Sequence, residues 1–153
     1  MKIKLLLLLI FVFSITISCN QFEKKKDKQT ETVNSNFTDE EDFNTFLQNF
    51  SKKPTFQRQR VLFPLDATLL DPSEYSMQTV SEEIKYNEWL LLDFSYDSTY
   101  AIRQMDRYEQ LIRVYEDSTI IEHRGIDNGI YANYYFLKID GKWYLKSFTD
   151  TSY

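Results

Sequence analysis

Apolar and polar residues alternate on both sides of an Asp-Gly dipeptide near the C-terminus. The runs 129–139 and 142–148 are rich in aromatic residues, and Asp140-Gly141 lies between them. Alternation with a period of two predicts half-buried strands, and Asp-Gly between two such runs is a strong hairpin signal. We therefore predict a β-hairpin over residues 129–148, against which the rest of the domain packs.

The length of the hairpin loop decides which side chains share a face, because a slip of one residue reverses every side chain. A two-residue loop at Asp140-Gly141 pairs Leu137 with Tyr144 and mixes lysines with apolar groups on each face. A three-residue loop over 139–141 pairs Leu137 with Trp143. We predict the three-residue loop, with Trp143 facing inward. The lysines that then share the other face are Lys138, Lys142 and Lys146.

Two further alternating runs, 109–116 and 119–126, predict a meander with turns at Asp117-Ser118 and Asp127-Asn128-Gly129. Two-residue and three-residue loops at these turns give four cross-strand rows. One face carries Val114–Ile121–Tyr135–Leu145 and Ile112–His123–Asn133–Ser147. The other carries Arg113–Glu122–Tyr134–Lys146 and Tyr115–Ile120–Phe136–Tyr144. The first face is apolar at its centre, so we expect helices to cover it, and we expect Arg113 to pair with Glu122.

Helical periodicity precedes the strands. Apolar residues recur at i, i+3, i+4 and i+7, which predicts one buried helix face: Phe43, Phe46, Leu47 and Phe50. Thr38 and Glu41 fit a capping box before this helix. Pro54 suits the first turn of a second helix that runs to about Arg60, and an extended segment follows at 61–63.

The middle of the chain gives weaker signals. Ser81 can cap a short segment through Ile84. The apolar run Trp89–Phe94 fits a buried helix or a strand, and we favour a helix as far as Leu92. We also predict a strand over 100–104.

The N-terminus carries a targeting pattern. Lys2 and Lys4 precede an apolar run over 5–17 that ends at Ser18-Cys19. A basic start and a short apolar middle are typical of a signal peptide, whereas a spanning helix needs about 20 residues. The residues before Cys19 resemble the lipobox of a bacterial lipoprotein, which implies that Cys19 carries the lipid after cleavage. The alternative is an ordinary signal peptide with an incidental cysteine.

These patterns divide the chain into a signal peptide (1–18), a flexible tether (19–37) and a single α+β domain (38–153). We expect the protein to be anchored to a bacterial membrane in the cell envelope, on the periplasmic side or the outer surface. The membrane partner is lipid, through Cys19. The lysines of the tether either rest on anionic head groups or are simply solvated: Lys24, Lys25, Lys26 and Lys28.

Composition excludes several classes of function. Removing Lys2 and Lys4 from the 18 basic residues leaves 16 against 23 acidic ones, a net charge of −7 without a basic stripe, which argues against nucleic-acid binding. One cysteine and one histidine cannot build a Cys/His zinc site, and the three glycines form no phosphate-binding loop. We expect no metal and no cofactor.

The stretch 56–65, FQRQRVLFPL, resembles a motif of an uncharacterised lipoprotein family, domain of unknown function 4348. The Phe-rich helix, the region around Trp89 and the strand after Asp140 are similar to it as well. The resemblance implies an α+β cone similar to nuclear transport factor 2 and cystatin. Such a cone has a curved antiparallel sheet, here of about four to five strands, with N-terminal helices on its concave face. It implies no catalytic residues.

Three functions remain open. The first is a non-enzymatic binding domain that uses a concave pocket, with these ligand candidates: His123, Asn133, Tyr135 and Arg60. The second is a small enzyme with His123, the only imidazole, as general base; a buried structural histidine is the alternative. The third is a dimerisation module. A protein partner or second copy would then bind an outward aromatic row: Tyr115, Ile120, Phe136 and Tyr144.

Overall fold

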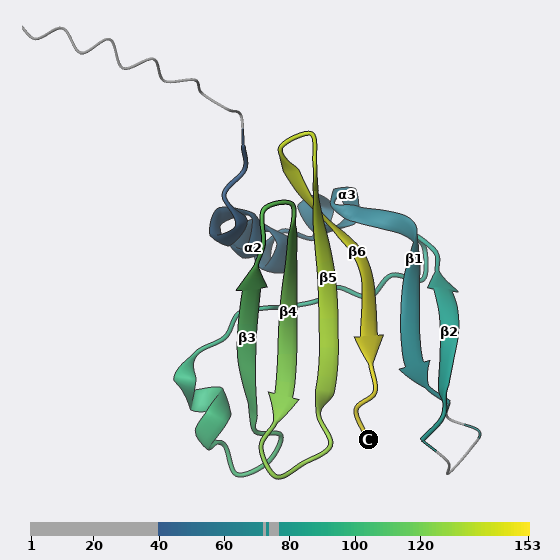
Figure 1. Cartoon of the computed structure of the whole chain (residues 1–153), viewed down its shortest axis with the longest axis vertical. Coiled ribbons are helices and arrows are strands. Elements are labelled where there is room, and N and C mark those ends of the chain that lie inside the picture. Colours follow the sequence, from purple (N-terminus) through teal and green to yellow (C-terminus); the bar gives the residue numbers. More distant parts are fainter. Residues whose placement is uncertain (1–39, 72, 74–76) are drawn as a thin grey trace, which may run out of the picture. The chain divides into compact units, whose positions relative to one another are not determined.

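The computed structural model describes residues 40–153, except 72 and 74–76. The expected signal peptide, the tether and the cap residue Thr38 lie outside the described residues. Residues 36–153 form one compact unit. In the described part of this unit, two short α-helices and one 3-10 helix accompany a six-stranded sheet (Figure 1).

The strand order in the sheet is β2-β1-β6-β5-β4-β3. The strands are β1 (Val61–Leu70), β2 (Thr79–Ile84), β3 (Tyr108–Val114), β4 (Ser118–Gly125), β5 (Tyr131–Ile139) and β6 (Lys142–Asp150). Neighbours are antiparallel except β1 and β6, which are parallel. The expectation of four to five antiparallel strands was therefore wrong in count and in the direction of one pair. Pro64, which obscured the first strand, falls where the β1–β6 register shifts.

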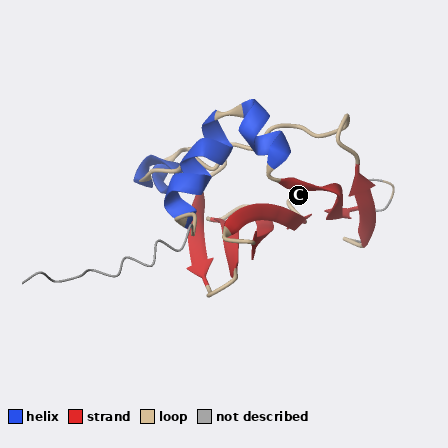
Figure 2. Cartoon of the chain, turned by 90° about the horizontal axis from the view of Figure 1, so that it is seen from above, coloured by secondary structure: helices blue, strands red, loops and turns tan. Residues whose placement is uncertain are grey.

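Helices α2 (Phe43–Lys52) and α3 (Pro54–Gln59) lie on one side of the sheet, which we call the helix-covered face (Figure 2). The predicted Phe stripe of α2 is buried as expected, and Pro54 occupies the first turn of α3. The predicted capping box was wrong. Asp42 caps α2, accepting a 2.8 Å hydrogen bond from the backbone N–H of Thr45.

An irregular segment, 85–97, connects the two edges of the sheet and crosses the helix-covered face (Figure 1). Its Trp89 and Phe94 are buried in the core. The helix predicted up to Leu92 is absent. The strand predicted over 100–104 is absent as well, since the 3-10 helix η1 (Ser98–Ile102) overlaps its first three residues. Ser81 lies in β2 instead of capping a segment. Tertiary contacts, which local periodicity does not reveal, hold this crossing segment in place.

The side chain of Gln57 supplies the principal polar contact of the crossing segment. It is 1% exposed. Its Nε2 donates to the carbonyls of Phe50 and Leu92, each at 2.7 Å, and its Oε1 accepts from Trp89 Nε1 at 3.1 Å and Leu92 N at 2.9 Å. The amide thus makes four hydrogen bonds, and a buried amide with all its partners carries no desolvation penalty from unpaired groups.

The hairpin between β5 and β6 has the two-residue loop, so the predicted three-residue loop was wrong. Ile139 pairs with Lys142, and Leu137 pairs with Tyr144. Asp140 and Gly141 have φ values of 49° and 74°, as a type I′ turn requires. The structure accommodates the lysine that this register turns inward.

That lysine is Lys138, which shares a face with Trp143. Trp143 is buried as predicted, 2% exposed. The Nζ of Lys138 lies 4.9 Å from the centre of the Trp143 ring and 3.6 Å from a carboxylate oxygen of Glu40. The methylene chain of a lysine can thus cover a buried ring while its ammonium group pairs with a carboxylate. The prediction that all three lysines face solvent did not allow for this arrangement.

The other two turns also differ from the predicted ones. Tyr115 N donates to Ser118 O, which places the β3–β4 loop at 116–117, and Gly125 N donates to Ile130 O, which gives a four-residue loop over 126–129. The β4–β5 register therefore slips by one. Ile121 now faces Tyr134 instead of Tyr135.

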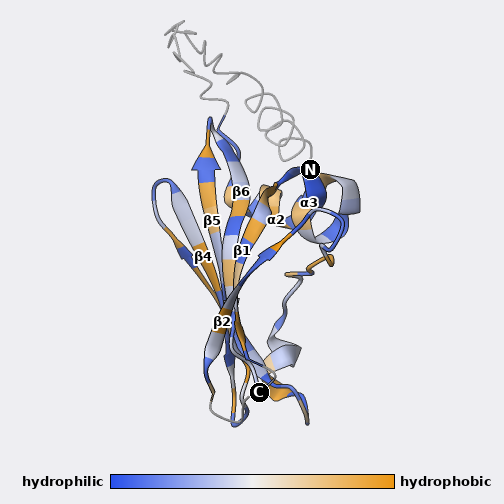
Figure 3. Ribbon diagram, turned by 90° about the vertical axis from the view of Figure 1, so that its right-hand side faces the viewer, coloured by the Kyte–Doolittle hydropathy of each residue, from blue (hydrophilic) through white to orange (hydrophobic). Residues whose placement is uncertain are grey.

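The slip exchanges the faces of β5. The residues of β5 that are buried beneath the helices are Ala132, Tyr134 and Phe136. Asn133, Tyr135 and Leu137 belong to the opposite side, which we call the open face. Figure 3 shows the strands from the side, with helices α2 and α3 on one side of them. The predicted Arg113–Glu122 ion pair is present, with Nε and Oε1 2.8 Å apart.

We predict that Gln57→Leu lowers the free energy of unfolding by about 3 kcal/mol or more, because it leaves two buried N–H groups and two carbonyls without partners. Urea unfolding of residues 36–153 measures this. The matched control is Gln59→Leu in the same helix, whose side chain is exposed. Equal stabilities of the two variants would contradict the role given to Gln57.

Candidate functional site

Aromatic rings fill the space between the helices and the sheet. Phe136 lies at the centre of this cluster, with ring centroids 5.5 to 5.9 Å from four others: Phe43, Phe46, Phe50 and Phe94. Trp143 contacts Phe43 edge-on at 5.1 Å. The interior that a cone-shaped fold can use for a ligand is therefore occupied here by side chains of the core.

A groove of about 310 Å³ lies on the open face instead. The open-face side chains that line it come from β4, β5 and β6: Ser118, Ile120, Tyr135, Leu137, Lys146 and Ser147. Both helices and the crossing segment lie on the opposite side of the sheet (Figure 2). Among the residues that the structure describes, neither helix and no part of the crossing segment covers this face, so the groove is accessible.

A β-bulge in β6 shapes the groove. Phe136 pairs with Leu145, but Tyr135 pairs with Ser147, so Lys146 is the extra residue. Leu145 is buried beneath the helices, whereas Ser147 pairs with Tyr135 and therefore lies on the open face. The extra residue, Lys146, lies on the open face as well. The bulge therefore places an ammonium group and a hydroxyl beside the Tyr135 ring.

The predicted partner row is partly changed by the register. Phe136, predicted to face outward, is 1% exposed and belongs to the core. Tyr115 is 55% exposed, and Ile120 and Tyr144 lie on the open face with it. Tyr135 and Leu137 take the place of Phe136, and only the length of the 126–129 loop could have revealed this from the sequence.

A second hollow, of about 560 Å³, lies between α2, residues 94–96 and β3. Its lining is largely amide and hydroxyl groups with a single ammonium group: Asn44, Gln48, Ser51, Lys52, Ser95 and Gln110. It also borders Ile112, which is 40% exposed at the sheet edge. This hollow opens next to β3, the last strand of the sheet.

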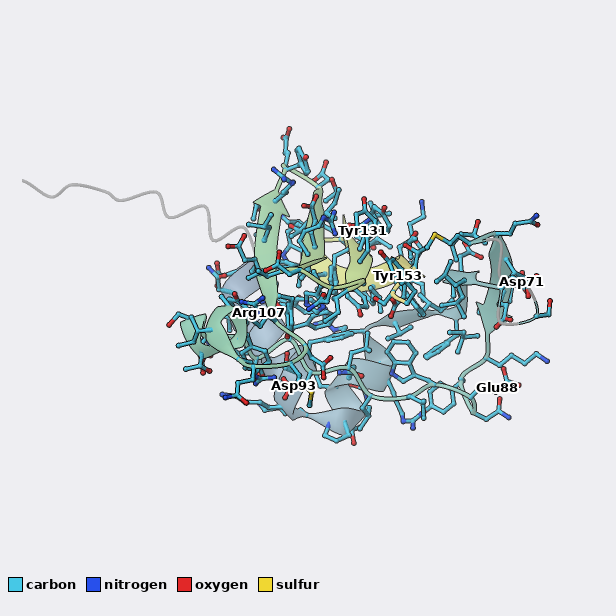
Figure 4. The ribbon with its side chains drawn as sticks, turned by 90° about the horizontal axis from the view of Figure 1, so that it is seen from below. Asp71, Glu88, Asp93, Arg107, Tyr131 and Tyr153 are labelled. Atoms are coloured by element: carbon cyan, nitrogen blue, oxygen red, sulfur yellow. The ribbon has the colours of Figure 1, made fainter. Side chains whose placement is uncertain are left out.

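A third hollow, of about 450 Å³, lies where β1, β2 and the C-terminus meet. Its lining is mainly apolar: Leu70, Met77, Thr79, Tyr131, Thr151 and Tyr153. Figure 4 shows Tyr131 and Tyr153 close together at this end of the sheet. Backbone bonds hold the tail there, since Thr151 N donates to Tyr131 O at 2.9 Å.

His123 lies on the helix-covered face, as predicted, among aromatic rings. Its ring centroid is 4.7 Å from that of Tyr108 and 5.3 Å from that of Tyr134. The Gln110 carboxamide donates to the carbonyl of Phe94, which directs its oxygen to His123 Nε2 at 2.9 Å. Nε2 therefore donates this hydrogen bond, which fixes the orientation of the imidazole.

Burial lowers the pKa of His123 to about 4, and the opposing effect of Asp150 is smaller. Burial also raises the pKa of Tyr134 to about 12. Both shifts favour the uncharged form of a desolvated group. A base with a pKa near 4 binds protons weakly at neutral pH, so this arrangement resembles a buried structural histidine more than a general base.

The predicted ligand candidates are not brought together. His123 opposes Ala132 in the sheet and faces the helices, whereas Asn133 lies on the open face, where its Oδ1 accepts from Arg124 Nη2 at 2.6 Å. Tyr135 lies on the open face as well. These residues therefore do not share one pocket.

Arg60, the fourth candidate, joins three parts of the fold. Its guanidinium donates two hydrogen bonds to the Glu41 carboxylate, at 2.9 and 3.1 Å, and one to Trp143 O at 3.0 Å. Trp143 N donates to Glu41 Oε2, and Trp143 Nε1 donates to Glu41 O. The pair thus fastens the start of α2 to the β5–β6 hairpin.

Metal and membrane features are absent from the described part of the chain. Across residues 40–71, 73 and 77–153, no three His, Cys, Asp or Glu side chains are placed to hold a metal ion. Within these same ranges, no helix combines the length and the apolar character that crossing a membrane requires.

Comparison with known proteins identifies the family. A family model matches residues 41–153, so the chain belongs to that family, which is uncharacterised, and the resemblance to domain of unknown function 4348 is confirmed. A comparison with curated proteins finds no match.

Two solved structures share the α+β fold. A nuclear transport factor 2-like protein from Bacteroides fragilis has a TM-score of 0.53 and 24% identity, over 74% of this chain and 48% of that one. A cystatin-like protein from Bacteroides caccae has a TM-score of 0.53 and 27% identity, over 72% and 76%. The chain thus spans about half the length of the Bacteroides fragilis protein.

We predict that His123 makes the domain less stable in acid. Because its pKa falls from an ordinary 6.5 to about 4 on folding, only the unfolded chain takes up this proton between those values. The free energy of unfolding then decreases as pH falls through this window, by at most about 1.4 kcal/mol per pH unit, and by less because the ring keeps some water contact.

Urea unfolding at pH 7, 5.5 and 4.5 tests this prediction. The variant His123→Gln retains the carboxylates, so the difference between the two proteins isolates the imidazole. The same decline of stability in both proteins would show that the histidine titrates normally in the folded state.

Proposed function

We propose that the chain is a lipid-anchored interaction domain of the cell envelope that binds a protein partner through its open sheet face. The observation that carries the proposal is the contrast between the two faces. Rings fill the centre of the helix-covered face, and the hollow at its β3 edge has a largely polar lining, whereas the open face has an accessible groove lined by Ile120, Tyr135 and Leu137. Apolar groups with a polar rim are typical of protein contact sites.

The groove favours a partner of particular chemistry. Tyr135 and Leu137 provide an apolar floor, and Lys146 is exposed beside them. Arg113 also lies on this face, where its guanidinium already donates to Glu122. The partner we propose is therefore a protein segment that inserts an apolar side chain and places a carboxylate near Lys146.

Anchoring through Cys19 would hold this domain near its partner. A tether of 18 residues, 20–37, separates the cysteine from the domain. Chains of this composition keep a bound domain within a few nanometres of the membrane. A lipid anchor therefore raises the local concentration of the open face toward other envelope proteins.

The geometry supports an enzyme with His123 as base less well. Gln110 occupies Nε2, and the low pKa of the imidazole weakens proton abstraction at neutral pH. The third function, a dimerisation module, differs from the proposal only in the identity of the partner. The mass of a cross-linked product distinguishes the two.

Site-specific photo-cross-linking in intact cells tests the open face. We expect a photoreactive phenylalanine analogue at position 135 or 120 to give one adduct of discrete mass. The same analogue at Tyr86 should give none, because Tyr86 is 57% exposed but lies with the crossing segment, away from the groove. An added excess of residues 36–153 should compete, and the same domain with Tyr135→Ala should compete at least tenfold less well.

An adduct of two copies of the chain would support the dimerisation module instead. Equal labelling from position 86 and the open face, or no adduct at all, would contradict a binding role for this groove.

Metabolic labelling with a fatty acid tests the anchor. We expect label on the wild-type chain and none on Cys19→Ser, which should also leave the membrane fraction. The control restores a thiol elsewhere, with Ser35→Cys in the Cys19→Ser chain. Label on this control, or on Cys19→Ser, would contradict lipid attachment at Cys19.

A further inference from the structure

The outer side of β3 has backbone groups that no other strand uses. β3 ends the sheet and pairs only with β4. The N–H of Tyr115 donates to the carbonyl of Ser118, so the backbone groups of Tyr115 point toward β4. Because the direction alternates along a strand, the N–H and C=O groups of Arg113, Leu111 and Glu109 point toward β4 as well. The remaining groups, of Gln110, Ile112 and Val114, point away from the sheet and make no hydrogen bond within the described ranges.

This free edge has a defined lower end. The hydroxyl of Tyr96 donates to the carbonyl of Tyr108 at 3.1 Å, which closes the edge below Gln110. Above that point, Ile112 is 40% exposed and Val114 is 62% exposed. The free edge therefore comprises residues 110–114.

The two edges of the sheet differ in their protection. At the other edge, β2 presents Glu82 and Glu83 next to each other, both exposed. Charges of this kind discourage pairing with another strand. The 110–114 edge has no proline, lysine or register irregularity, and its one charged residue, Arg113, is paired with Glu122 of the neighbouring strand.

We propose that β3 pairs antiparallel with β3 of a second copy of the chain, centred on Ile112. In this register Gln110 opposes Val114 of the second copy, and Ile112 opposes its own equivalent. All the free backbone groups then find partners, in about six hydrogen bonds. The result is one continuous sheet across the two copies.

The charges select this register over its neighbour. Centring on Ile112 places Arg113 diagonal to Glu109 of the second copy, and this carboxylate is exposed. Centring on Arg113 would instead set two guanidinium groups directly opposite each other. The self-pairing is thus complementary in one register and repulsive in the next.

The hollow of about 560 Å³ beside β3 gives the incoming strand room. Because it lies between α2 and the edge, side chains on the helix-covered side of an added strand enter it. In the proposed register these are the Ile112 and Val114 side chains of the second copy. They would cover the exposed Ile112 side chain next to the polar lining of α2.

Sedimentation equilibrium of residues 36–153 tests the proposal. We expect a concentration-dependent dimer, whose dissociation constant increases at least tenfold in Ile112→Lys, since the substitution sets two ammonium groups opposite each other. The matched control, Val80→Lys on the β2 edge, should leave it unchanged. A monomer at all concentrations, or equal effects of both substitutions, would overturn the proposal.

Cross-linking identifies the surface without a charged substitution. Cys19 is the only cysteine, so residues 36–153 contain none and one introduced thiol is unique. With a short bismaleimide, we expect Ile112→Cys to give a covalent dimer and Tyr135→Cys to give none. A dimer from Tyr135→Cys alone would overturn edge pairing in favour of the open face. This inference does not depend on the partner proposed for that face.

Discussion

The buried amide of Gln57 is the contact on which the arrangement of the helix-covered face depends. Four hydrogen bonds from one side chain join the end of α2 to residues 89–92 of the crossing segment. This segment has no regular backbone pairing of its own, so its polar groups need partners from elsewhere in the chain. Gln57 supplies them and allows Trp89 and Phe94 to enter the core. Both ends of the Gln57 amide are thus used within the fold.

A second polar contact acts in the same way at the other end of the helices. Glu41 and Arg60 join the start of α2 to the β5–β6 hairpin through charged hydrogen bonds. Arg60, which the sequence made a ligand candidate, is therefore engaged within the protein, as is the buried amide of Gln57. With the centre of the helix-covered face filled by rings, and Gln57, Glu41 and Arg60 engaged within the fold, the surfaces we propose for recognition are the open face and the β3 edge.

The sequence predicted the elements whose periodicity is local. The Phe stripe of α2, the start of α3 at Pro54 and the four C-terminal strands follow from patterns of 3.6 and two residues. It failed where loop length decides. The loop over 126–129 is one residue longer than predicted, so Tyr134 and not Tyr135 lies beneath the helices. The hairpin loop was predicted wrongly because we assumed that every lysine side chain faces solvent. The crossing segment could not be predicted, because it is ordered by long-range contacts with the amide of Gln57, and such contacts leave no periodic pattern in the sequence.

The most direct test of this account is amide and indole hydrogen exchange by nuclear magnetic resonance on residues 36–153. The account predicts that the indole N–H of Trp89 and the amide of Leu92, both bound to Gln57 Oε1, exchange only through global unfolding, as slowly as the most protected amides of β5. Rapid exchange of both groups in a folded domain, with the β5 amides still protected, would contradict it. The helix-covered face would then open locally, and the case for recognition on the outer surfaces would lose its basis.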